Sequence, residues 1–251
     1  VSIKHISVDF FDKLSFEGLL IEDKKQDTLV YAGAAKVNIT DWFFFKDNAT
    51  LKFFGLNDAV ININRTDSVW NYQFLIDYFS SPKKDNTTKG GIEFDLQVLK
   101  FENVVFNKQD KWIGQDMQVA MRKLDLKADF INFNKKQISI SDLILDAPAF
   151  IQSVYKGNKP KVETDNLRDL VPKMPVLSAL QWNTGGWKIE LKNIELNNAS
   201  FKYDIETDRG IFTDRFDPQH IQFMGITGSL KNVSFINDTL TTNLKLRTKE
   251  R

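Results

Sequence analysis

The sequence predicts an all-β protein in which one elongated, twisted antiparallel sheet of repeating strands curls around a hydrophobic groove, with one short helix near 165–171. Three observations predict this class. Apolar and polar residues alternate in many short runs, which is the pattern of strands with one buried face. The 21 Phe residues suit pleated surfaces. One short pattern also restarts from end to end of the chain, so the strands are expected to repeat.

The repeating pattern has two apolar residues at a spacing of two, a two-residue polar step that ends in Asn, Asp, Gly or His, and two more apolar residues. It occurs at 1–8, 99–106, 138–145, 189–196 and 230–235. The three-residue jump reverses the phase of alternation, as a β-bulge or tight bend does. It leaves open whether both halves of a motif face the same side. The stretches 138–150 and 189–201 align almost residue for residue, which strengthens the case for a repeat.

In chain order, further strands are expected wherever apolar residues alternate or nearly alternate. These runs lie at 14–16, 29–31, 35–39, 51–53, 60–63, 70–74, 119–121, 124–126 and 240–246. Each strand is expected to be about five to seven residues long.

Two segments interrupt the strand pattern. Residues 80–91 include a proline and a glycine pair but no apolar residue, which predicts an exposed loop. Asp165 offers an N-cap and is followed by apolar residues at helical spacing, before Pro172 and Pro175 end the helix. The expected organisation has groove segments at 1–79, 92–161 and 187–251, separated by the loop 80–91 and by a linker at 162–186 that contains the helix.

Composition excludes several classes of protein. Charged residues make up 27% of the 251 positions, which is incompatible with a membrane-embedded body. The 34 Lys and Arg residues are interspersed with 33 Asp and Glu, so the sequence lacks the basic stripe that a nucleic acid requires. Without cysteine there is neither a disulfide nor a thiolate metal site. The chain opens and closes inside strand patterns, so we expect a segment of a longer protein.

No constellation of residues points to catalysis. His5 and His220 are the only imidazoles, and neither has a second ligand at local spacing, so we expect structural histidines and no metal or other cofactor. Nucleophile elbows, phosphate loops and dinucleotide fingerprints are absent from the sequence. The carboxylates of 204–217 are interspersed with Arg209 and Arg215, which favours a solvated loop over a carboxylate pair for glycoside hydrolysis. The chain is not expected to be an enzyme.

An open sheet has one difficulty, which is its exposed apolar face. Something apolar must fill the groove, and the acyl chains of a phospholipid would suit it. Trp42 and the three Phe residues at 43–45 place bulk on both faces of a strand; they indicate either a second covering layer or contact with lipid. The residues expected to line the groove are Ile3, Val8, Leu51, Phe53, Leu99, Phe101, Ile138, Ile140, Ile189, Leu191, Leu230 and Phe235.

The sequence resembles a known family at several places. Residues 1–33, from Val-Ser-Ile-Lys-His-Ile to Leu-Val-Tyr-Ala-Gly, look like the first strands after the membrane anchor in TamB proteins of the AsmA-like superfamily, in the form found in Bacteroidota. The stretches 187–203, 216–221 and 228–240 look similar to later strands of the same proteins. These stretches carry strand patterns without a catalytic signature.

The resemblance implies an N-terminal periplasmic segment of a protein held in the inner membrane by one helix that lies outside this sequence. Such proteins form a twisted β-taco, a trough with a hydrophobic interior. With an outer-membrane barrel of the Omp85 kind, bound through another part of the protein, they serve in outer-membrane protein assembly and in phospholipid passage between the two membranes. The alternative reading is a β-sandwich that acts as a surface binding or adhesion module, with Trp and Tyr residues as a sugar platform.

Overall fold

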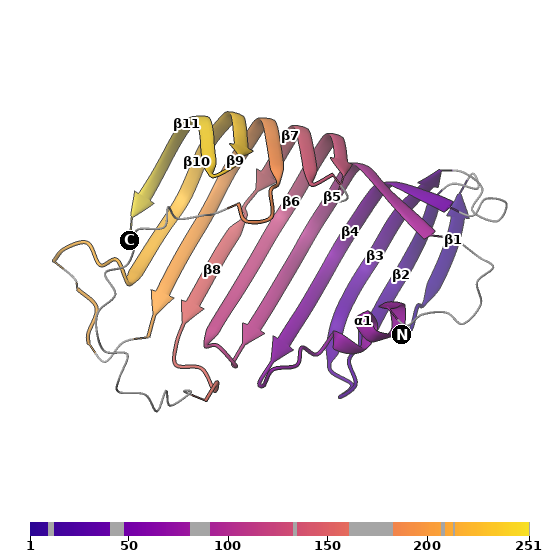
Figure 1. Cartoon of the computed structure of the whole chain (residues 1–251), viewed down its shortest axis with the longest axis horizontal. Coiled ribbons are helices and arrows are strands. Elements are labelled where there is room, and N and C mark those ends of the chain that lie inside the picture. The colour runs from indigo at the N-terminus through magenta and orange to yellow at the C-terminus, as the bar shows by residue number, and fades with distance from the viewer. Residues whose placement is uncertain are drawn as a thin grey trace, which may run out of the picture.

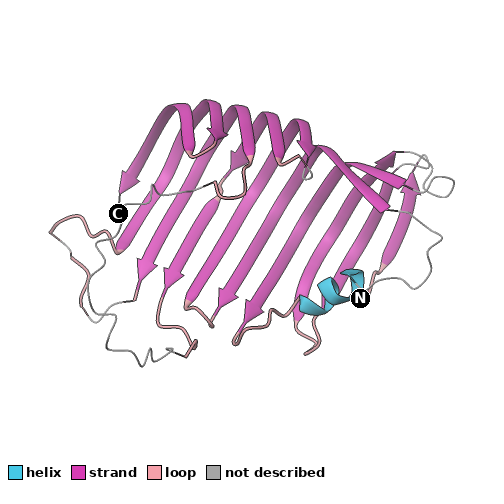
Figure 2. Ribbon diagram, in the orientation of Figure 1, coloured by secondary structure: helices cyan, strands magenta, loops and turns pink. Residues whose placement is uncertain are grey.

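The computed structural model describes residues 1–9, 13–40, 48–80, 91–132, 135–160, 183–206, 209–212 and 214–250. Their strands form a single 11-stranded sheet, accompanied by one short helix (Figures 1 and 2). The strands are β1 (His5–Asp9), β2 (Lys13–Glu22), β3 (Thr28–Thr40), β4 (Asn48–Arg65), β5 (Gly91–Asp110), β6 (Gln115–Asn132), β7 (Gln137–Asp146), β8 (Ala149–Val154), β9 (Lys188–Ile205), β10 (His220–Ile236) and β11 (Thr239–Glu250); the helix α1 spans Gln73–Ser80. The all-β prediction is confirmed.

The strand order is β1-β2-β3-β4-β5-β6-β7-β9-β10-β11, and β8 pairs with β6 and β9. β7 and β8 lie along one line, interrupted at Pro148, which has no N–H to donate to a neighbouring strand. After β1, the sheet is therefore built from three antiparallel meanders: β2 to β4, β5 to β8, and β9 to β11.

Adjacent meanders meet in parallel. β4 pairs with β5 in parallel, and β7 and β8 both pair with β9 in parallel. The sheet is mostly antiparallel, as predicted, and departs from that pattern only at these two junctions among the described strands. A parallel neighbour needs a connection that carries the chain back to the other end of the sheet, and these two connections lie between β4 and β5 and between β8 and β9 in the sequence.

The strands are longer than predicted, reaching 20 residues in β5. The pattern restarts within these long strands, because left-handed residues or register shifts interrupt the alternation and it resumes beyond them. The runs 119–121 and 124–126, expected as two strands, both lie in β6. In Figure 1 the strands toward the C-terminal end of the sheet curve over along its upper border.

A first bend line crosses the sheet at residues with left-handed backbone conformation. Gly18, Asp58, Asn103, Ala147 and Asn198 have φ between 46° and 60°, and the register of the flanking pairs places them side by side with Gly33 and Arg122. Glycine adopts this conformation freely, and Asn and Asp tolerate it better than other residues.

The bends point the apolar face inward. At Asp58 and Asn103 two consecutive polar residues share the outer side, whereas Phe101 and Val104, three residues apart, pack in the same cluster. The extra residue lengthens the outer side of the strand, so the sheet bends toward its apolar side. The two halves of this motif therefore face the same way.

Buried apolar side chains gather where the sheet bends. At the first bend line, Ala32, Ala35, Leu56, Ala59 and Val104 form one cluster, and both Ala32 and Ala59 are completely buried. Small side chains at this position let the two sides of the bend approach each other. A second bend line crosses β6, β7 and β10 at register shifts, and four buried residues accompany it. They are Leu126, Ile131, Ile140 and Val233.

One expected strand is wrong. Residues 70–74 form a turn and the start of α1. The Asp67 carboxylate accepts a hydrogen bond from the Val69 N–H at 2.8 Å. The rings of Trp70 and Tyr72 stack with centroids 5.7 Å apart. These two contacts stabilise a turn where the alternating aromatic residues had indicated a strand. The predicted loop 80–91, the helix at 165–171 and the aromatic run at 42–45 fall mostly or wholly outside the described residues.

Candidate functional site

The inner face of the sheet forms a trough lined by continuous rows of apolar side chains. The register places one residue from each of ten strands in a single line, which we call the upper row. It consists of Val8, Leu14, Val37, Phe54, Leu99, Leu126, Leu143, Ile194, Leu230 and Leu244. All ten residues are apolar. At about 4.8 Å between strands, the row is about 43 Å long.

A second line, the middle row, runs beside the upper row along the first bend line. It consists of Ile6, Phe16, Ala35, Leu56, Phe101, Leu124, Leu145, Leu196, Gly228 and Leu246. Gly228 is its single member without a side chain. The Phe54 and Phe101 rings meet edge to face with centroids 6.0 Å apart, so the two rows are in contact.

Beyond the bend line a third line, the lower row, crosses eight strands. It consists of Ile21, Val30, Ile61, Phe106, Val119, Phe150, Phe201 and Phe223. Above the upper row, the rim row closes the other side of the trough over β6 to β11. It consists of Ile131, Ile138, Ile189, Phe235 and Leu240.

The opposite face carries mainly polar side chains, because alternate residues of a strand point to opposite sides. Behind the upper row the same strands place Lys127, Asp142, Asn193 and Lys231 in register. The sheet is thus apolar inside and largely polar outside.

Most of the trough remains partly accessible. Leu99, Leu143 and Leu230 in the upper row are half-buried, whereas Leu126, beside the second bend line, is 8% exposed. At the last strand Leu244 is 57% exposed. None of the described elements forms a second layer over these rows. The inner face is therefore shielded by its own curvature and open along its length.

The structure places most of the predicted groove residues in these rows. Val8, Leu99 and Leu230 lie in the upper row, and Phe101 lies in the middle row. Ile138, Ile189 and Phe235 belong to the rim row, and Ile140 and Leu191 pair with each other just inside it. Leu51 pairs with Ile39 beyond a bulge at Lys52, and Ile3 lies near the free edge of the sheet, 36% exposed.

The prediction that Phe53 lines the groove is wrong. Its neighbour Phe54 packs against the inner cluster, so alternation puts Phe53 on the outer face, where its ring lies beside Gly55. The sequence misled here because Phe53 and Phe54 are adjacent aromatics and the bulge at Lys52 shifts the phase. Seven further residues complete the upper row without having been predicted: Leu14, Val37, Phe54, Leu126, Leu143, Ile194 and Leu244. Only the register, which brings distant strands together, shows that they align.

Below the lower row, polar contacts close the trough. The Arg65 guanidinium donates to both carboxylate oxygens of Asp110, at 2.7 and 2.8 Å, across the parallel strands β4 and β5. Asp110 is 1% exposed, and the hydrogen bond from Arg65 holds the pKa of its carboxyl below the ordinary value. The Trp70 ring lies 4.5 Å from the Arg65 guanidinium, which it covers from one side.

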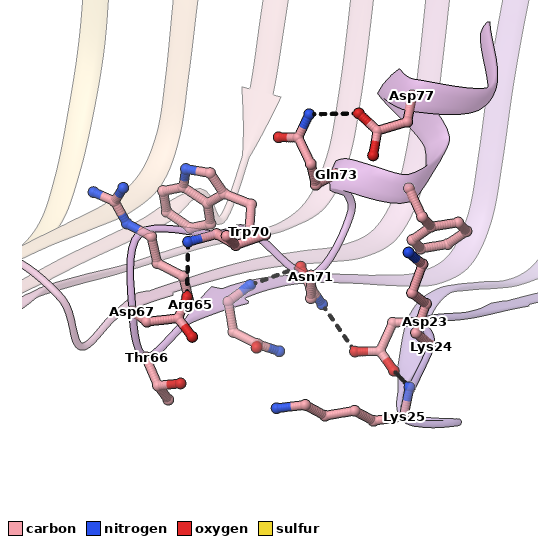
Figure 3. Close-up of a pocket in the computed structure, with 13 residues that line it drawn as sticks. Asp23, Lys24, Lys25, Arg65, Thr66, Asp67, Trp70, Asn71, Gln73 and Asp77 are labelled. Carbon is pink, nitrogen blue, oxygen red and sulfur yellow. Dashed lines mark hydrogen bonds between the residues drawn. The ribbon is translucent and has the colours of Figure 1, made fainter. Parts of the chain in front are cut away.

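A small hollow lies beside this pair, between the β2–β3 turn and the start of α1 (Figure 3). Its volume is about 250 Å³. The Asp23 carboxylate accepts hydrogen bonds from the N–H groups of Lys25 and Asp27 at 2.8 and 3.0 Å, and Asn71 bridges to the Asn64 N–H at 3.0 Å. These bonds satisfy the main polar groups of the hollow, which therefore serve to fix the turn.

The carboxylate-rich segment is ordered where the structure describes it. Asp217 is buried and receives two hydrogen bonds from Arg209, at 2.8 and 2.6 Å, which hold the pKa of its carboxyl well below the usual range. Arg209 and Arg215 both lie 4.0 Å from the centroid of the Phe212 ring. The expectation of a solvated loop is wrong for Asp217, whose carboxylate accepts hydrogen bonds from Arg209 and from the N–H groups of Phe212 and Gln219.

The described residues contain no cluster of three or more His, Asp or Glu side chains arranged to bind a metal. His220 places Nδ1 2.5 Å from an oxygen of Asp204, and His5 is exposed at the first strand. Within the described part of the chain, α1 is too short to cross a bilayer, and no other helix could do so.

Comparisons with known proteins add no identification. No protein-family model matches the chain, and no curated protein matches it.

Proposed function

We propose that this chain is a non-enzymatic lipid-conducting segment, whose trough holds phospholipid acyl chains and lets them move along the sheet. The observation that carries the proposal is the upper row: ten apolar side chains in register across ten strands, without a covering layer among the described elements. A large exposed apolar face marks an interaction site or a liability to aggregate, and an apolar occupant would cover it.

Acyl chains fit this surface in length and in energy. A row of about 43 Å exceeds the thickness of a bilayer's hydrocarbon core, which is about 30 Å, so an acyl chain can lie along several strands. Burial of each methylene contributes roughly 0.8 kcal/mol, and partial enclosure is enough to hold a chain.

Movement along the trough follows from its repetition. Each strand offers nearly the same apolar surface as its neighbour, so a chain that shifts by one strand spacing of about 4.8 Å exchanges equivalent contacts. None of the ten residues of the upper row carries a charge that would hold a headgroup in one place. This is the property expected of a conduit rather than of a storage pocket.

The sequence resemblance supplies the setting of the proposal. We infer a TamB-like periplasmic segment, anchored in the inner membrane through a helix elsewhere in the protein, that works with an Omp85-type barrel in lipid passage and outer-membrane protein assembly. Phospholipid acyl chains are the proposed cargo, without a cofactor and without nucleic acid.

Adjacent residues of β7 provide a matched test. Leu143 lies in the upper row, and Ile144, next to it, alternates to the outer face between Asp125 and Glu195. We expect Leu143→Gln to reduce the phospholipid that co-purifies with the chain, measured by native mass spectrometry, and to slow transfer of a fluorescent phospholipid between vesicles. Ile144→Gln should leave both unchanged, and both variants should keep the strand signal in circular dichroism.

Two results would overturn the proposal. One is a wild-type chain that carries no lipid and transfers none. The other is an equal effect of the two substitutions on lipid, which would show that the inner face has no special role. A chain that binds oligosaccharide instead, through its aromatic residues, would favour the adhesion module.

A further inference from the structure

A hollow of about 770 Å³ lies over β1 to β5. Most of the residues that line it alternate with the upper row and therefore face away from the trough. Lys13, Lys36 and Lys52 frame it, and Phe53 and Val98 form an apolar floor. Lys13 and Lys36 sit on neighbouring strands in adjacent register positions, since Lys13 pairs with Asn38 and Lys36 pairs with Ser15.

The apolar floor is an exception on this face. Phe53 and Val98 pair with each other, and the same outer line continues on either side through Asn38 and Lys127. Gly55, the neighbour of Phe53 on the outer face, leaves room for the Phe53 ring, because a Cβ at Gly55 would stand 3.2 Å from the ring. β4 and β5 thus place apolar side chains where the flanking strands β3 and β6 place polar ones.

Among the described residues that line the hollow, positive charge dominates. None of its three lysines forms an ion pair with another described residue, and Glu17 is the one carboxylate among the described residues that line it. The Asn38 side-chain oxygen is buried in the same place and lacks a hydrogen-bond donor among the described residues. A buried acceptor without a donor is unusual, and a hydroxyl-bearing ligand would satisfy it.

We propose that this hollow binds the headgroup of an anionic phospholipid at a membrane surface. Lysines near a negatively charged bilayer gain electrostatic attraction, and an aromatic ring next to them suits the boundary between headgroups and acyl chains. The site is on the opposite face from the trough, so this inference goes beyond the lipid conduit and does not depend on it.

Vesicle flotation of the purified chain tests the site. Vesicles of phosphatidylcholine with phosphatidylglycerol should carry the chain upward, and vesicles of phosphatidylcholine alone should not. The double variant Lys36→Gln/Lys52→Gln should bind the anionic vesicles about 25-fold more weakly, because each lysine near such a surface contributes about fivefold in affinity. The matched control is Lys231→Gln/Lys245→Gln, which removes two exposed lysines of the outer face over β10 and β11.

The control variant should bind like the wild type. Equal weakening by both double variants would show general attraction of a charged surface and would overturn the site, as would absence of wild-type binding to anionic vesicles. Release of the chain by millimolar inorganic phosphate at constant ionic strength would assign the hollow to a free anion instead. Leu143→Gln separates the two proposals, because it should impair lipid retention in the trough while leaving flotation unchanged.

Discussion

The rings of Phe150 and Phe201 stack almost parallel, at an interplanar angle of 3° and with centroids 5.7 Å apart, across the parallel strands β8 and β9. They occupy equivalent places in the stretches 138–150 and 189–201, and the register pairs Ile138 with Ile189 at the other end. The sequence repeat is therefore a spatial repeat of adjacent strands.

This stack should be measurable as a pairwise coupling. In a double-mutant cycle with Phe150→Leu and Phe201→Leu, we expect the two losses in unfolding free energy to differ from additivity by about 0.5–1.5 kcal/mol, the range for aromatic pairs. Urea unfolding gives the measurement. Phe150→Leu combined with Phe235→Leu is the control, because Phe235 lies in the rim row and should add independently.

The first bend line depends on left-handed residues. Asn103 has φ 52°, a conformation that costs a β-branched residue about 1–2 kcal/mol or more. We expect Asn103→Val to lower the unfolding free energy by at least that amount, and Asn103→Gly to be tolerated much better. Lys100→Val, at an exposed strand position of β5 with ordinary backbone, is the control. Equal stability of the two Asn103 variants would show that the bend does not require this conformation.

The Arg65–Asp110 pair should make stability depend on acid pH. Because the folded pKa of Asp110 is depressed, the pair stabilises the fold above the ordinary carboxyl pKa and loses this contribution as pH falls through the folded pKa. Asp110→Asn should cost about 2 kcal/mol at neutral pH, with the difference from wild type shrinking in acid. Urea unfolding at a series of pH values measures it, and a difference that stays constant with pH would contradict the assignment.

Tyr155 gives the corresponding prediction in alkali. Burial and the hydrogen bond from its hydroxyl to Asp116, 2.8 Å long, raise its pKa from 10.0 to about 12. Because the folded pKa is raised, the contribution of Tyr155 to stability is fully present below pH 10. It is lost as the pH rises through about 12. Tyr155→Phe should therefore cost about 1 kcal/mol at neutral pH, and its deficit should narrow in strong alkali. An ultraviolet titration of the wild-type phenol checks the pKa directly.

Adjacent residues show where sequence reasoning worked and where it failed. The alternation around Leu99 and Phe101 predicted strand and inward side chains, because period two is a local property of the backbone. The same reasoning failed at Phe53, since a bulge at Lys52 reverses the phase and the sequence does not show on which side the extra residue falls. It also failed at Trp70 and Tyr72, where stacking of the two rings favours a turn.

The sequence by itself determined that the chain is all-β, that its strands are apolar on one face and that its pattern repeats, since these properties depend on neighbours within a few residues. Tertiary structure alone decided the register across strands. That register joins Val8 to Leu244 in one apolar row, makes two junctions parallel, and aligns Asp58 with Asn103 into a bend line. The physical reason is that strand partners are chosen by non-local hydrogen bonds and by burial at the bends, which no local pattern specifies.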